Sequence, residues 1–186
     1  NEAKERYSLQ KEVKNLQELN ARIAQDAVNL TNALKGESKK QGIWGEMVLE
    51  RVLESSGLVK GREYELQVTL KSAEGTRLQP DAIVRLPEAK DVVIDSKVSL
   101  SSYEKYCSTD DETLSQAALT AHIRSIRTHI KQLSAKDYQS LKGIRTLDYI
   151  LMFVPIESAF SLATQEDPDL YTDALARQIA IVTPST

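Results

Sequence analysis

The chain has 186 residues, of which 41% are hydrophobic and 27% are charged, and its formal net charge is -3. This composition predicts one soluble domain with an extension and excludes a disordered tail. The single cysteine, Cys107, excludes an internal disulfide and a cysteine-based zinc site, and two histidines are too few for a histidine-rich metal centre. No apolar run approaches the length of a membrane-spanning helix, and the net charge argues against a surface that grips DNA everywhere but allows a local basic patch.

A heptad repeat occupies the first part of the chain. Its seam alternates steps of four and three through Leu9, Val13, Leu16, Asn20, Ile23, Ala27, Leu30 and Leu34. So narrow a stripe favours a self-associating coiled coil over a single helix folded onto its own domain, and Asn20 on the seam would fix register and oligomer state. We therefore expect a coiled-coil helix over 1–36 and a second domain over 37–186. Both chain ends are abrupt and indicate a piece of a longer protein, with the second domain truncated at its C-terminal end.

The second domain has the periodicity of a mixed α/β fold. A helix is expected over 42–56, with Gly57 as its C-terminal cap, and its predicted buried residues are Trp44, Met47, Val48, Val52 and Leu53. The elements expected after it are strands over 63–71, 78–86 and 91–98, a long helix over 112–133, a strand over 149–155, two short helices and a strand over 179–182.

Two neighbouring predicted strands carry charges that strand propensity does not explain. Asp81 follows Pro80 at the start of one strand, and Asp95 and Lys97 lie at the end of the next. A turn through residues 87–89 sets three pairs, which are Leu86 with Lys90, Ile83 with Val93, and Asp81 with Asp95. All three charged side chains then share one face, and a register shift of one residue would separate the acids.

Paired carboxylates repel each other unless a cation neutralises them, and oxygen ligands suit Mg²⁺ or Mn²⁺. Lys97 would hold a phosphate or orient a metal-activated water, so the cluster predicts phosphodiester hydrolysis. Each residue also has a purely structural interpretation. Asp81 is typical of turns and Lys97 of protected strand edges, and Glu46, an acid of the helix expected over 42–56 that is also a candidate below, is typical of helix starts.

Pro80-Asp81 with Asp95-Ser96-Lys97 resembles the PD-(D/E)XK signature of restriction-endonuclease-like nucleases. From about Leu34 to the last residue the chain resembles the RmuC family of bacterial DNA recombination proteins. The segments that carry this resemblance are GIWGEMVLERVLESSGL, LQPDAIVRL, DVVIDSKVSLSSYEKY, LMFVPIESAF and IAIVTPST. It implies a restriction-endonuclease-like core of helix, three-stranded antiparallel meander, helix and strand, in a mixed sheet flanked by helices.

The resemblance also implies site residues. Asp81, Asp95 and Glu46 would be catalytic metal ligands, and Lys97 would be the catalytic lysine. Glu50 would serve instead of or alongside Glu46, and the Ser96 carbonyl would be an extra metal ligand. Gln79 is a weaker candidate for the site. The implied cofactor is Mg²⁺ or Mn²⁺ and the implied partner is DNA. Family members carry an N-terminal membrane anchor before a long coiled coil, so we expect a cytoplasmic domain, free or tethered to the inner membrane through a segment outside this sequence.

The long helix has three cations along one border of its apolar arc, Arg124, Arg127 and Lys131. They would contact the DNA backbone or form a solvated flank. Two functions remain open: a metal-dependent DNA nuclease, and a DNA-binding scaffold, catalytically weak or inactive, that oligomerises through its coiled coil. Intact acids and Lys97 favour the nuclease, and the near-neutral charge mildly favours the scaffold.

Overall fold

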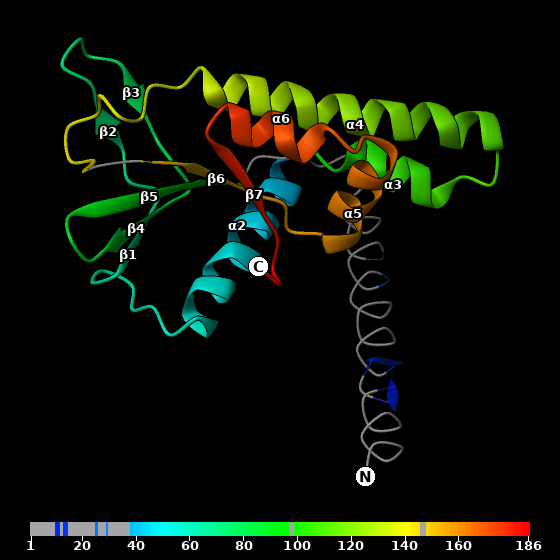
Figure 1. The fold of residues 1–186 in the computed structure, drawn as a ribbon, viewed down its shortest axis with the longest axis horizontal. Helices are drawn as coiled ribbons and strands as arrows, with labels where there is room; N and C mark the ends of the chain where they lie inside the picture. The colour runs from blue at the N-terminus through cyan, green and yellow to red at the C-terminus, as the bar shows by residue number, and fades with distance from the viewer. Residues whose placement is uncertain are drawn as a thin grey trace.

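The computed structural model describes residues 38–96, 99–145 and 148–186, together with Gln10, Lys11, Val13, Lys14, Gln25 and Asn29 (Figure 1). The predicted coiled coil therefore lies almost wholly outside the described residues, and Lys97 does too. No helix among the described residues is long and apolar enough to cross a membrane.

The central sheet has five strands in the order β1-β4-β5-β6-β7. Their bounds are Tyr64–Leu66, Ala82–Leu86, Lys90–Asp95, Ile150–Phe153 and Ile179–Val182. The pairs β1–β4 and β4–β5 are antiparallel, whereas β5–β6 and β6–β7 are parallel. The sheet is therefore mixed, as the sequence predicts.

The first two predicted strands are each broken in two. A separate hairpin of β2 (Leu70–Lys71) and β3 (Arg77–Leu78) is inserted between β1 and β4. Gln67 ends β1 with a φ of 52°, which is left-handed backbone, and Pro80 has no N–H to donate between β3 and β4. The expected three-stranded meander is thus β1, β4 and β5 with a hairpin inserted in it.

Helices cover both faces of the sheet (Figure 1). The helices are α2 (Ser38–Ser55), α3 (Ser101–Ser108), α4 (Glu112–Ser134), α5 (Glu157–Glu166) and α6 (Leu170–Ala176). In Figure 1, α4 and α6 lie above the sheet and α2 below it. The prediction of α4 is confirmed to within one residue, whereas α3 was not predicted.

Strand parity divides the core into two layers. Ile83 and Val93 pack in one cluster with Ile126 of α4, and Val84 and Ile94 pack in another cluster, with α2. The predicted Gly57 cap of α2 is confirmed by its φ of 82°. Met47 is 59% exposed, so its predicted burial is wrong, and Leu49, two positions further along the helix, is buried instead.

Candidate functional site

The β4–β5 hairpin has the predicted register. Leu86 pairs with Lys90 and Ile83 with Val93, and the last pair of the ladder is Ala82 with Ile94. Asp81 directly precedes that pair and donates its backbone N–H to the Ile94 carbonyl, at 3.1 Å. Asp81 is 2% exposed and Asp95 is fully buried. Two buried acids therefore lie at the same end of the hairpin.

Asp95 is held by two side chains, one from α4 and one from the residues just after it. His129 of α4 donates from Nε2 to Asp95 Oδ1 at 3.2 Å, and Lys136 donates from Nζ to Oδ2 at 2.9 Å. Burial opposes ionisation, but the hydrogen bonds and charges of His129 and Lys136 outweigh it and hold the pKa of Asp95 well below its usual range. Asp95 is therefore a carboxylate throughout the neutral pH range.

Asp81 is held by residues of its own sheet edge. Its Oδ2 accepts from the Ser96 backbone N–H at 2.7 Å and from the Ser96 hydroxyl at 3.1 Å. Its Oδ1 accepts from Gln67 Nε2 at 3.1 Å, and Gln79 Nε2 in turn donates to the Gln67 carbonyl at 2.9 Å. Gln79 thus acts through Gln67, while Ser96 presents its amide and hydroxyl to Asp81.

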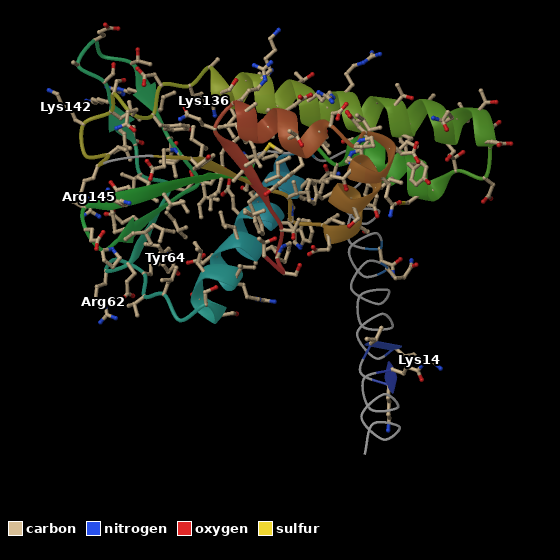
Figure 2. The ribbon with its side chains drawn as sticks, viewed as in Figure 1. Lys14, Arg62, Tyr64, Lys136, Lys142 and Arg145 are labelled. Carbon is tan, nitrogen blue, oxygen red and sulfur yellow. The ribbon has the colours of Figure 1, made fainter. Side chains whose placement is uncertain are left out.

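Tyr138 lies next to both acids. Its side chain is buried, and burial raises its pKa, which the charges of Asp95 and Asp81 raise further. Lys136 Nζ lies 3.4 Å from the Tyr138 hydroxyl and 5.7 Å from the centre of its ring. The two carboxylates, Lys136 and Tyr138 therefore form one electrostatic cluster beneath α4. Figure 2 labels Lys136 near the C-terminal end of that helix.

The two acids of α2 lie in different surroundings. Glu50 accepts a hydrogen bond from Lys60 Nζ at 2.7 Å, which ties it to the loop after α2. Glu46 is half-buried and adjoins Gly45, where a Cβ would lie 3.7 Å from Pro155 Cγ, just beyond the end of β6. The middle of α2 thus lies near the edge where β5 and β6 end, which favours Glu46 over Glu50 as a third acid.

The described residues contain no group of three His, Cys, Asp or Glu side chains arranged to hold a metal ion. The two carboxylates nevertheless fit Mg²⁺, because this ion typically takes one or two carboxylates and completes its shell with waters and substrate phosphate. Lys97 lies outside the described residues, so its predicted place beside these acids stays a prediction.

The three cations of α4 are not alike. Arg127 forms ion pairs with Asp167 and, at 2.8 Å, with Asp173. Arg124 and Lys131 are exposed. The structure therefore engages Arg127 in holding α4 to the α5–α6 region and leaves Arg124 and Lys131 on the surface.

Sequence reasoning missed His129, Lys136 and Gln67 as partners of the acids. His129 precedes Ile130, which belongs to the apolar arc that packs on the sheet. A polar residue on the border of such an arc lies near the edge of the sheet, so the position of His129 in the sequence could have indicated a contact with that edge. Nothing in the sequence indicates that Gln67 contacts Asp81, because this contact depends on the unpredicted break after β1.

These features define a class, an α/β protein whose mixed sheet carries two buried carboxylates at one hairpin end beside a lysine and a histidine. The model of the RmuC family matches residues 1–186, and the chain belongs to this family. No solved structure matches it.

Three relatives show how far the similarity extends. A DNA recombination protein RmuC homolog of Pseudomonas aeruginosa is 57% identical over 185 residues, which are 100% of this chain and 41% of the relative. The DNA recombination protein RmuC of Escherichia coli K12 is 55% identical over the whole chain, which covers 39% of it. The Vibrio cholerae homolog is 52% identical, and the chain covers 36% of its length. The chain thus spans about two fifths of these relatives.

Proposed function

We propose that this chain is the nuclease domain of a DNA recombination protein and hydrolyses DNA phosphodiester bonds with a PD-(D/E)XK site in a restriction-endonuclease-like core. The observation that carries the proposal is the burial of Asp81 and Asp95 at one hairpin end, with Lys136 Nζ 2.9 Å from Asp95. Buried acids beside cations are the arrangement that metal-dependent phosphoryl chemistry needs. The relatives' name, DNA recombination protein, supports DNA as the substrate.

Each residue has a distinct role in this proposal. Asp81 and Asp95, together with Glu46, would hold Mg²⁺ or Mn²⁺, with Glu50 and the Ser96 carbonyl as further oxygen donors. The bound metal supplies Lewis-acid activation of the scissile phosphate and of the attacking water. Lys97 stabilises the charge of the phosphate or orients the water.

The remaining contacts fix the orientation of the acids. Ser96 and Gln67 hold Asp81 through three hydrogen bonds, and Gln79 holds the backbone of Gln67. His129 and Lys136 keep Asp95 ionised and aligned. Carboxylates that are already charged and fixed need little reorganisation when substrate binds.

The heptad repeat over 1–36 supports a proposed homo-oligomer, in which the coiled coil joins two or more nuclease domains. A tether to the inner membrane, through a segment outside this sequence, is the corresponding proposal for location. Light scattering of the purified protein tests the first proposal, and a monomer at micromolar concentration would contradict it.

A second candidate is a DNA-binding scaffold that does not cut. One observation favours it, because the oxygens of Asp81 and Asp95 already accept hydrogen bonds from protein groups. Carboxylates satisfied in this way are stable without metal. The nuclease and the scaffold differ in one measurable property, cleavage.

The test is a cleavage assay with Mg²⁺ or Mn²⁺ on linear and circular DNA. Wild-type protein should nick or degrade the DNA, while Asp95→Ala, Lys97→Ala and chelation by EDTA should abolish the activity. A Glu88→Gln variant, in the exposed turn of the same hairpin, is the matched control and should cleave normally. DNA binding without cleavage by correctly folded wild-type protein would establish the scaffold instead.

A further inference from the structure

Positive charge is concentrated along α4 and the residues just after it. Residues 113–136 contain four Lys or Arg and two His but no Asp or Glu, in a chain of net charge -3. Since acidic residues outnumber basic ones in the whole chain, this segment departs from its surroundings. A local stretch without acids is what a protein of negative net charge needs if it is to approach a polyanion.

A hollow of about 370 Å³ runs along the exposed side of α4. We call it the Arg124 hollow, and its lining residues are Ser99, Ala121, Arg124, Ser125, Thr128, His129 and Gln132. None of these described lining residues is acidic. Arg124 supplies a guanidinium, and the serine, threonine and glutamine side chains supply neutral hydrogen-bond donors.

The Arg124 hollow adjoins the acid pair. His129 lines it and also donates to Asp95 at 3.2 Å, so one side chain belongs to both. Ser99, another lining residue, lies four residues after the end of β5, in the connection from β5 to α3. A ligand in this hollow would therefore end beside His129, one hydrogen bond away from Asp95.

We infer that the Arg124 hollow binds the sugar–phosphate backbone of a DNA strand and leads it to Asp95. The inference rests on the proposed function, which makes DNA the substrate. One guanidinium flanked by hydroxyl and amide donors matches a chain of phosphates, to which such groups make most protein–DNA hydrogen bonds. Phosphate contacts of this kind position the strand without reading its sequence.

The neighbouring cations show why Arg124 is the principal residue. Arg127 is one turn further along α4, but its guanidinium is committed to Asp167 and Asp173. Lys131 lines a neighbouring hollow that shares Arg124 and Thr128 with the Arg124 hollow but not His129. Of the three cations of α4, Arg124 is therefore the one that lines the hollow shared with His129, the partner of Asp95.

Fluorescence anisotropy with a short labelled oligodeoxynucleotide in EDTA tests the inference without cleavage. Arg124→Gln should weaken binding about tenfold, as expected for one charged hydrogen-bonding contact. The slope of log K against log salt should become shallower by about one. Arg51→Gln is the matched control, because Arg51 is an exposed helical arginine on α2, across the sheet from α4. Equal losses in both variants, or no loss in Arg124→Gln, would overturn the inference.

A second variant adds a charge instead of removing one. Thr128→Glu places a carboxylate in the Arg124 hollow at an exposed helical position, where glutamate is tolerated, and should weaken DNA binding at least tenfold. Unchanged DNA binding by folded Thr128→Glu would sink the inference. If an acidic peptide binds the wild-type protein tightly and DNA does not displace it, the inference would also be wrong.

The two proposals fail separately. If DNA binding depends on Arg124 but the protein does not cleave DNA, binding at the Arg124 hollow is supported and the nuclease proposal is refuted. If the protein cleaves DNA but binding does not depend on Arg124, the nuclease proposal is supported and binding at the Arg124 hollow is refuted.

Discussion

The β4–β5 hairpin carries a buried carboxylate near each end, and different side chains hold the two. Near the turn, Asp91 accepts from Arg145 Nε at 2.9 Å, Arg145 Nη2 at 2.7 Å, the Arg145 backbone N–H at 2.6 Å and Arg85 Nη1 at 2.7 Å. At the other end, the described donors to Asp95 include one nitrogen of His129 and one of Lys136. Figure 2 labels Arg145 and Lys136 in these two regions.

The two carboxylates respond alike to their partners. In each case burial opposes ionisation, and hydrogen bonds from the cationic neighbours reverse this and lower the pKa of the carboxyl group. The direction of the pKa shift therefore does not distinguish a structural acid from a functional one. The type of partner does, since arginine forks lock a carboxylate in place, whereas lysine is a single mobile charge that another cation can replace.

The largest expected effect is on cleavage at the Asp95 end. Asp81→Asn keeps an oxygen for the Ser96 N–H but removes the charge, so cleavage should fall at least about a hundredfold. Melting temperature should stay near that of the wild type. Plasmid nicking with Mg²⁺ measures the loss, and normal nicking by this variant would remove Asp81 from the site.

The next effect is on stability at the Asp91 end. Asp91→Ala leaves two arginines without their shared partner and should lower the free energy of unfolding by about 3 kcal/mol. Urea titration measures this. Glu65→Ala, which removes the more exposed partner of Arg85, should cost less than about 1 kcal/mol. A similarly small cost for Asp91→Ala would erase the contrast between the two ends.

A third substitution makes the Asp95 end resemble the Asp91 end. Lys136→Arg replaces a single mobile charge with a fork, so the protein should be slightly more stable while cleavage slows about tenfold. Lys90→Arg, at the exposed turn of the hairpin, should change neither property. If Lys136→Arg cleaves like the wild type, the exchangeable character of Lys136 has no functional importance.

The smallest effect concerns the pH dependence of the stability of the protein, against which the two ends of the hairpin are compared. Burial lowers the pKa of His122, so between that pKa and about 6.5 the unfolded chain binds more protons than the folded one. Stability should therefore fall as pH decreases below about 6.5, by at most about 1.4 kcal/mol per pH unit. Asp91 and Asp95, whose pKa values are lowered, add their own loss only at more acidic pH.

His122→Gln keeps an N–H donor for the Ala159 carbonyl but does not titrate. Chemical denaturation between pH 5 and pH 7 should show a flatter profile for this variant. An unchanged profile would assign the pH dependence in this window to other groups.

The sequence predicts features that depend on local pattern. Strand alternation and a short turn determined the register of the β4–β5 hairpin, and an apolar arc of period 3.6 located α4. The partners of Asp95 are 34 and 41 residues away from it along the chain. The apolar arc of α4 places His129 near the edge of the sheet, but no local pattern identifies Asp95 as its partner. The break at Gln67 depends on its left-handed backbone, which glutamine propensity does not suggest.

The inserted hairpin of β2 and β3 begins where the chain leaves the central sheet at Gln67 and ends where the chain returns to it at Asp81. Gln67 donates both its backbone N–H and its side-chain amide to Asp81, at 3.1 Å each, and Gln79 closes the base of the hairpin. Its tip, Glu74 and Gly75, is exposed. Because both ends are fastened at the acid, this tip is a natural position for inserting a fluorescent or affinity tag without displacing Asp81.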